Sequence, residues 1–169
     1  MGNWRKYLPF IVLVLIILGA AAVNLWRISQ KPKELAEEKG EIQDAKSWRL
    51  SLSETELDLL ARVVHAEARG EPYEGQVAVA AVIINRVLHP EFPNTISGVV
   101  YEPLAFQVVA NGQVNQPASE EAIRAAHDAL NGFDPTGGAI YFYNPAKTSS
   151  AWIRSRPVVK TIGKHVFAA

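Results

Sequence analysis

The middle of the chain, residues 77–84, is apolar on every side of any helix or strand that it forms. It reads VAVAAVII, with no polar residue in eight positions. Neighbouring elements must cover such a segment on all faces. The segment extends from about residue 72 or 73 to Val87 before the next turn signal, and this length favours a helix over a buried strand. We therefore expect a domain built around one central helix.

Another helix is predicted directly before the central one. Ser53 and Glu56 have the spacing of a capping box, which begins a helix. This helix is expected to run to about Ala68. Gly70 and Pro72 then separate the two helices, because glycine suits a left-handed C-terminal cap and proline cannot continue a helix. The chain thus predicts two consecutive helices joined by a tight turn.

Short elements are expected in the rest of the domain. Thr95 and Ser119 are predicted to begin two helices, which end near Tyr101 and Leu130. Alternating patterns and turn signals predict strands over residues 139–143, 158–162 and 165–167, and a hairpin formed by residues 106–109 and 113–115 around 110–112. Together the elements predict an α+β domain that is mainly helical, with small β-hairpins.

One carboxylate lies on the apolar side of the first predicted helix, close to its end. Leu60, Val63 and Val64 precede Glu67 by seven, four and three residues, so on a helix they share its face. A carboxyl group among aliphatic side chains resists ionisation and stays a proton donor near neutral pH. Cleavage of a glycosidic bond requires such a donor. The alternative is a solvated glutamate paired with a neighbouring arginine.

An uncharged segment of nineteen residues, Leu8 to Trp26, lies near the start of the chain. Its length is about enough to cross a bilayer core, and basic and aromatic residues flank it. We expect residues 1–28 to contain one N-terminal transmembrane helix that anchors an extracytoplasmic domain in the cell membrane. A signal peptide cleaved near residues 20–22 is the alternative, and it would secrete the same domain.

The remaining chain divides into a polar linker, residues 29–48, and a domain, residues 49–169. The domain contains ten basic and twelve acidic residues, and five of the basic residues follow the last acidic one, Asp134. This basic end suits an anionic polymer, but the charge density is too low to predict binding of nucleic acid. The chain has no cysteine, which excludes disulfides and thiolate chemistry.

Four segments of the domain carry a more specific signal. In chain order they are LARVVHAEARGEPYEGQVAVAAVIINRV, FPNTISGVVYEPLAFQ, ALNGFDPTGGAIYFYNP and SRPVVKTIGKHVFA. Over residues 55–169 they resemble the spore cortex-lytic enzyme and cell-wall hydrolase family with its SleB-type catalytic domain. The resemblance implies a lysozyme-like, lytic-transglycosylase-like fold that acts on the glycan strands of peptidoglycan, with spore cortex as one substrate.

The resemblance also implies that Glu67, the first glutamate of the AEARGE motif, is catalytic. It would protonate the oxygen that leaves N-acetylmuramic acid and then accept the proton of the C6 hydroxyl, so that a 1,6-anhydro ring closes without a second carboxylate. Muramidase-type hydrolysis, with Glu71 placing a water, is the alternative; Glu71 otherwise stabilises the start of the next helix. Asp134 is a weaker candidate for a second carboxylate. No cofactor is expected.

Several further residues are predicted to bind the substrate. They are Glu71, Phe106, Gln107, Tyr143, Asn144, Trp152 and Arg156. Tyr143 and Asn144 end a predicted strand, where a phenol or an amide can face a sugar. Trp152 can stack on a sugar ring, and Arg156 can pair with a stem-peptide carboxylate. The alternative for this last segment is a solvated basic loop.

Two other functions remain open at this stage. One is an N-acetylmuramoyl-L-alanine amidase, whose activity a chelator would abolish, and the other is a non-catalytic peptidoglycan-binding module. None of the four histidines has the paired spacing of metal ligands on a helix, so no metal site is predicted. The expected partners are peptidoglycan strands and, through the N-terminal helix, the membrane.

Overall fold

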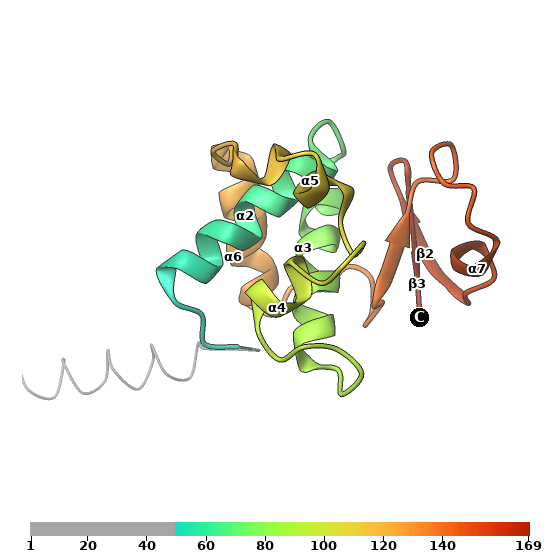
Figure 1. Ribbon diagram of the computed structural model, residues 1–169, viewed down its shortest axis with the longest axis horizontal. Coiled ribbons are helices and arrows are strands. Elements are labelled where there is room, and N and C mark those ends of the chain that lie inside the picture. Colours follow the sequence, from blue (N-terminus) through green and yellow to red (C-terminus); the bar gives the residue numbers. More distant parts are fainter. Residues whose placement is uncertain (1–49) are drawn as a thin grey trace, which may run out of the picture. The chain divides into compact units, whose positions relative to one another are not determined.

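The computed structural model describes residues 50–169, which Figure 1 shows in colour. The predicted transmembrane or signal segment (1–28) and the linker (29–48) lie outside the described residues. Within residues 50–169, no helix has the length and apolar character needed to cross a membrane. The elements are α2 Glu54–Ala68, α3 Tyr73–Leu88, α4 Ile96–Val100, α5 Gln107–Ala110, the 3-10 helix η2 Gln113–Asn115, α6 Glu120–Leu130, β1 Tyr141–Tyr143, α7 Ala151–Arg154, β2 Val158–Ile162 and β3 His165–Ala168.

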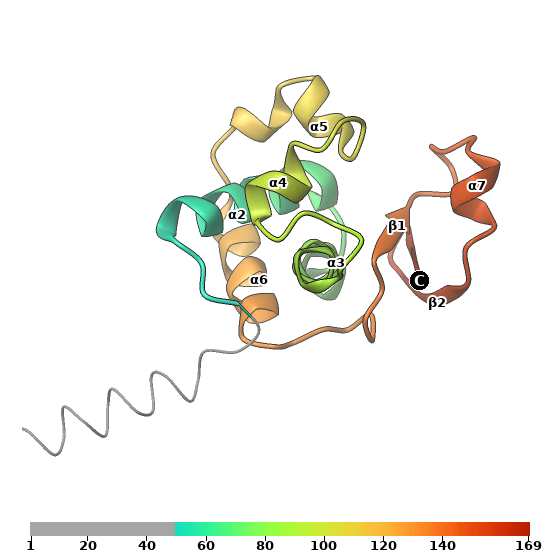
Figure 2. The ribbon, with the colours of Figure 1, turned by 60° about the horizontal axis from the view of Figure 1, so that its bottom comes forward.

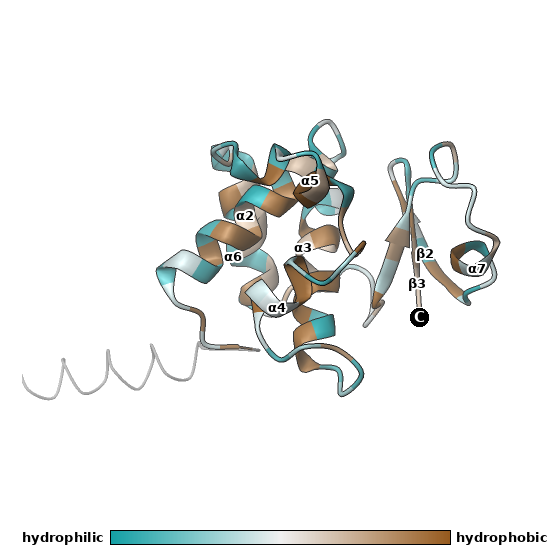
Figure 3. Ribbon diagram, viewed as in Figure 1, coloured by the Kyte–Doolittle hydropathy of each residue, from teal (hydrophilic) through white to brown (hydrophobic). Residues whose placement is uncertain are grey.

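Helix α3 is the central helix that the apolar segment predicts. Every residue from Gly75 to Val87 is buried. Helices α2, α4 and α6 pack against it, and β1 lies on its remaining side. Figures 1 and 2 show this arrangement, and Figure 3 shows hydrophobic residues over most of α3. Complete burial of a side chain such as Ile83 or Ile84 contributes about 1.5–3 kcal/mol.

The helices begin where their capping residues predict. The Ser53 hydroxyl accepts a hydrogen bond from the Glu56 N–H at 3.3 Å, and the Glu56 carboxylate accepts one from the Ser53 N–H at 3.1 Å. Thr95 and Ser119 accept equivalent bonds from Gly98 and Ala122, at 3.0 and 3.2 Å. Each cap contributes about 1 kcal/mol. The predicted starts of α2, α4 and α6 are therefore confirmed.

The hairpin predicted for residues 106–115 is wrong. This segment forms α5 and η2, whose backbone hydrogen bonds are local: the Asn111 N–H donates to Gln107 and the Asn115 N–H donates to Gly112, both at 3.1 Å. Val108 and Val114 turn into the core. Gly112 does adopt the left-handed conformation expected of a turn, with φ of 77°. It connects two helical turns, because burial of the two valines outweighs their preference for a strand.

The sheet has three antiparallel strands in the order β1-β3-β2. The terminal hairpin of β2 and β3 is confirmed, and β1 pairs with β3, so that Tyr141 lies opposite Ala168 and Tyr143 opposite Val166. Phe142 lies on the other face of β1, where its ring contacts those of Phe106 and Phe167 at centroid distances of 6.3 and 6.2 Å. The predicted alternation of β1 between two faces is therefore correct.

Strand β1 begins two residues later than predicted, and side chains of α3 bind the backbone carbonyls at that point. Asn85 Nδ2 donates to the carbonyl of Ala139 at 2.8 Å, and Arg86 Nε donates to the carbonyl of Ile140 at 2.7 Å. These carbonyls face α3 and are not part of a strand ladder. The two bonds fix the start of the sheet to the central helix.

The loop before β1 is organised by Asp134. Its carboxylate accepts hydrogen bonds from the Thr136 N–H and hydroxyl at 2.8 and 2.6 Å, from the Gly138 N–H at 2.9 Å, and from Asn85 Nδ2 at 3.0 Å. Burial alone would raise the pKa of Asp134, but these bonds stabilise the carboxylate and lower the pKa overall. The contacts of Asp134 are thus those of a loop-forming residue.

Candidate active site

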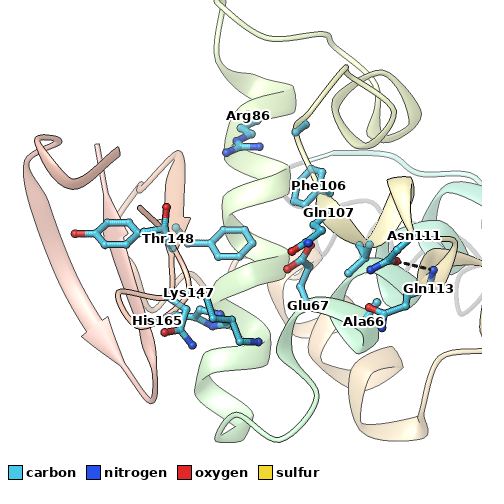
Figure 4. Close-up of a pocket in the computed structure, with 15 residues that line it drawn as sticks. Ala66, Glu67, Arg86, Phe106, Gln107, Asn111, Gln113, Lys147, Thr148 and His165 are labelled. Atoms are coloured by element: carbon cyan, nitrogen blue, oxygen red, sulfur yellow. Dashed lines mark hydrogen bonds between the residues drawn. The ribbon is translucent and has the colours of Figure 1, made fainter. Parts of the chain in front are cut away.

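Glu67, in the last turn of α2, lines a cleft of about 370 Å³ between the helices and the sheet. Figure 4 shows Glu67 and Gln107 beside each other on the helical side, with Lys147, Thr148 and His165 on the sheet side. Strands β1 and β3 and the loop after β1 supply the second wall. The cleft therefore depends on segments that are about 80–100 residues apart in the sequence.

The surroundings of Glu67 favour its protonated form. Leu60, Val63 and Val64, which precede it on the same face of α2, are completely buried. Burial raises the pKa of Glu67, while a hydrogen bond from the Val108 backbone and the positive charge of Lys147 lower it; the net shift is upward. A carboxyl group of this kind can donate a proton near neutral pH.

Four of the predicted substrate-binding residues line the cleft together with Glu67. Phe106 and Gln107 come from the start of α5, and Tyr143 and Asn144 come from the end of β1. Gln107 presents a polar side chain from one wall, and Tyr143 and Asn144 do so from the other. The arrangement suits a chain of sugars, whose hydroxyl and acetamido groups need hydrogen-bond partners on both sides.

Glu71 is predicted to bind substrate or place a water, but it does not line the cleft. Its carboxylate accepts a hydrogen bond from the backbone N–H of Lys164, in the turn between β2 and β3, at 2.8 Å. Gly163 in the same turn has φ of 57°, and a side chain there would collide with the Glu71 carboxylate and Pro72. Glu71 therefore connects the start of α3 to the hairpin that carries His165.

Trp152 and Arg156 lie in a neighbouring part of the site. Trp152, 53% exposed, lines a second hollow of about 380 Å³, which shares Arg86, Tyr143 and other lining residues with the cleft. The Arg156 guanidinium lies 4.1 Å from the centroid of the Trp152 ring system. Arg156 lines neither hollow; it covers one face of the indole. Trp152 therefore lies in a hollow that adjoins the cleft, and Arg156 packs on its indole.

Arg86 is a site residue that sequence reasoning missed. It lies on α3, lines both the cleft and the Trp152 hollow, and is buried, with its guanidinium carbon 5.3 and 5.4 Å from the ring centroids of Phe92 and Phe106. Burial lowers the pKa of Arg86, but an arginine remains protonated at neutral pH. The sequence contains a signal for its burial, because Arg86 lies two residues after a segment that has to be buried, but none for its place in a cleft.

His165 and Lys147 were also missed as site residues. His165 is 6% exposed, and its Nδ1 atom is buried without a hydrogen-bond partner in the described part of the chain. Burial lowers the pKa of His165 and so favours the neutral form of its imidazole. The spacing of the histidines in the sequence gives no sign of a role for His165 in the site. Among residues 50–169, no three His, Asp or Glu side chains gather into a potential metal site.

Known proteins resemble this chain over most of the described domain. A family model described as Cell Wall Hydrolase matches residues 70–168, beginning three residues after Glu67. The spore cortex-lytic enzyme of Halalkalibacterium halodurans is 49% identical over 138 residues, covering 82% of this chain and 42% of that protein. The spore cortex-lytic enzyme of Bacillus cereus is 55% identical over 115 residues, covering 68% and 44%. The chain thus spans less than half the length of these relatives.

Two solved structures match this chain over nearly their whole length. The crystal structure of the catalytic domain of the Bacillus cereus SleB protein has a TM-score of 0.68 and 51% identity, covering 73% of this chain and 96% of that one. The catalytic domain of the germination-specific lytic transglycosylase SleB from Bacillus anthracis has a TM-score of 0.68 and 52% identity, covering 70% and 98%. The sequence resemblance is confirmed: the chain belongs to the cell wall hydrolase family.

Proposed function

We propose that this protein is a peptidoglycan-degrading enzyme of the lytic transglycosylase type, which cleaves the glycan strand at N-acetylmuramic acid. The observation that carries the proposal is Glu67, a carboxyl group with a raised pKa that opens into a cleft of about 370 Å³. Among the described residues that line this cleft, Glu67 is the only carboxylic acid. One acid is sufficient where the substrate supplies its own nucleophile.

In the proposed reaction Glu67 acts twice. It first protonates the glycosidic oxygen, the bond from that oxygen to C1 of N-acetylmuramic acid breaks, and the neighbouring sugar leaves as an alcohol. The Glu67 carboxylate then accepts the proton of the C6 hydroxyl while the C6 oxygen bonds to C1, which closes the 1,6-anhydro ring and restores the acid. Acid–base catalysis of this kind contributes about 10²–10⁴-fold to the rate.

Other residues of the cleft support the two steps. Lys147 lowers the pKa of Glu67 through its charge, so it favours the carboxylate that exists between the steps. Gln107, Tyr143 and Asn144 present polar groups to the bound sugars. The solved relative from Bacillus anthracis is called a lytic transglycosylase, which also supports this proposal over hydrolysis by water.

Analysis of the products tests the proposed function. We expect the 169-residue protein to release soluble muropeptides from peptidoglycan, with an anhydro-sugar end that mass spectrometry finds one water lighter than a hydrolysed end. Reducing sugar ends would instead show muramidase-type hydrolysis. Release of peptides with new free amino groups would identify an amidase, and binding without any soluble product would identify a non-catalytic module.

Trp152 is proposed to stack on a sugar that lies some distance from the cleaved bond. Its indole is half exposed, and Arg156 and Tyr141 hold the ring, the latter at a centroid distance of 5.3 Å. We expect Trp152→Ala to raise KM for glycan strands by about 5- to 20-fold with little change in kcat, since stacking contributes about 1–2 kcal/mol to binding. Steady-state kinetics measure this, and an unchanged KM would contradict it.

Two finer points belong to the proposal. The names of the longer relatives suggest spore cortex as the substrate. The uncharged segment of residues 8–26 suggests a membrane anchor with the catalytic domain outside the cell membrane. Fractionation of cells that produce the whole chain tests the location: an intact protein in the membrane fraction supports an anchor, and a shortened protein in the medium supports a cleaved signal peptide.

A further inference from the structure

A third hollow of about 510 Å³ opens directly beside the cleft that holds Glu67. His65, Ala66, Arg69, Gln113, Gln116 and Lys147 are among the residues that line it. Three of these, Ala66, Gln113 and Lys147, also line the cleft, so the two hollows adjoin each other. Figure 4 shows Lys147 on the sheet side and Ala66 beside Glu67 on the helical side. A substituent of a sugar bound at Glu67 can therefore enter this hollow.

The lining of this hollow is cationic. Arg69 and Lys147 supply two positive charges, and no acidic residue of the described chain lines the hollow. Both side chains are exposed, and neither takes part in an ion pair with a described residue. His65 also lines the hollow, and its Nδ1 atom accepts a hydrogen bond from the Ser119 N–H at 3.3 Å.

This charge contrasts with the domain as a whole, where acidic residues outnumber basic ones by twelve to ten. A hollow lined by an arginine, a lysine and amide side chains is suited to a carboxylate, which a guanidinium can bind through two parallel hydrogen bonds. In peptidoglycan, N-acetylmuramic acid carries a peptide on its lactyl group, and the free carboxylates of that peptide are the anionic groups nearest to the glycan strand.

We infer that the hollow formed by Arg69, Lys147 and their neighbours binds a carboxylate of the stem peptide on the sugar at Glu67. The inference rests on the proposed function, because it requires a glycan strand in the adjoining cleft. It assigns Arg69 a role in specificity, since Arg69 lines this hollow and not the cleft. The enzyme would then prefer peptide-bearing muramic acid to muramic acid without a free peptide carboxylate.

The test uses two forms of one substrate and the 169-residue protein. Glycan strands with uncross-linked stem peptides are compared with the same strands after their peptide carboxylates have been converted to carboxamides, which removes the charge with little change in size. We expect kcat/KM to be about three- to tenfold lower on the amidated strands, as suits a carboxylate bound by partly solvated cations. This comparison needs no variant and does not depend on folding of a mutant.

Substitutions at Arg69 test whether the carboxylate preference arises in this hollow. Arg69→Gln is expected to reduce the difference in kcat/KM between the carboxylate and the amidated strands, because it removes one of the two positive charges that line the hollow. Arg69→Glu reverses the charge at this position and should lower kcat/KM on the carboxylate strands further. Arg124→Gln, a matched control on the exposed side of α6, should retain the wild-type preference.

The outcomes separate the inference from the proposed function. Equal cleavage of both substrates by the wild-type protein would overturn the inference and leave cleavage at Glu67 intact. A preference that persists unchanged in Arg69→Gln would also overturn it, because the carboxylate would then bind elsewhere. Cleavage of neither substrate would overturn the proposed function itself, and the inference with it.

Discussion

Replacement of Glu67 by glutamine is expected to reduce the release of soluble muropeptides by about 10²–10⁴-fold at neutral pH, because the amide cannot donate a proton to the glycosidic oxygen. Glutamine has nearly the same shape, and its carbonyl oxygen can still accept the hydrogen bond of the Val108 backbone. Product release is measured by liquid chromatography after incubation with peptidoglycan. Glu91→Gln, at an exposed loop position, is the matched control and should retain activity.

The same variant is expected to be more stable than the wild-type protein above neutral pH. The pKa of Glu67 is raised in the folded protein. The stability that protonated Glu67 gives the fold is therefore fully present below about pH 4.3, the ordinary pKa of glutamate, and is lost as the pH rises through the raised pKa. A glutamine never ionises, so it avoids this loss. The melting temperatures should therefore differ at pH 8 and converge near pH 4.

The activity and the stability expected of Glu67→Gln can be contradicted independently of each other. Wild-type activity in Glu67→Gln would show that Glu67 takes no part in the reaction. A melting temperature for Glu67→Gln that lies below that of the wild-type protein at both pH values would show that the carboxylate stabilises the fold, as in an ordinary ion pair at a helix end.

Replacement of Arg86 by methionine is expected to lower the free energy of unfolding by about 1–3 kcal/mol. The variant loses the hydrogen bond to the Ile140 carbonyl and the guanidinium contacts with the rings of Phe92 and Phe106. Relief of the cost of burying a charge offsets part of this loss. Urea denaturation at pH 7 measures the difference.

We expect Arg86→Met to raise KM as well, because the bond to Ile140 holds the strand that carries Tyr143 and Asn144. Arg86→Lys keeps the charge but lacks the planar group that lies over the rings. Its free energy of unfolding should therefore lie between those of the wild-type protein and Arg86→Met. Arg124→Met, at an exposed position, controls for the loss of a positive charge. A fully stable Arg86→Met variant would show that the fold does not need the buried guanidinium.

Much of the helical fold follows from local signals in the sequence. Ser53, Thr95 and Ser119 start helices as predicted, since each capping bond is made within three residues. The central helix follows from an apolar segment that only burial on all faces can satisfy. The terminal hairpin follows from two apolar segments on either side of Gly163.

The errors concern features that depend on distant parts of the chain. The segment of residues 106–115 forms short helices because Val108 and Val114 pack into a core that the helices create. For the same reason Arg86 and His165 were missed: each lines the cleft only because the sheet lies against α3. Local sequence patterns contain no information about which segments meet across a cleft.

The pKa of Glu67 depends both on a local sequence pattern and on distant segments of the chain. The apolar face of α2 is visible in the sequence, but the Val108 backbone bond and the Lys147 charge come from segments 41 and 80 residues further along. Both lower the pKa of Glu67 and so oppose the effect of burial. The sequence predicts the upward direction of the pKa shift from the apolar face alone, and only the structure reveals the two contributions that oppose it.

Titration of the Glu67 carboxyl group tests the central claim most directly. In the protein labelled with ¹³C at glutamate side chains, the Glu67 carboxyl resonance is identified by its absence from the spectrum of Glu67→Gln, and its chemical shift is followed against pH. We expect a pKa clearly above the ordinary glutamate value of about 4.3. A pKa at or below that value would contradict the assignment of Glu67 as the proton donor.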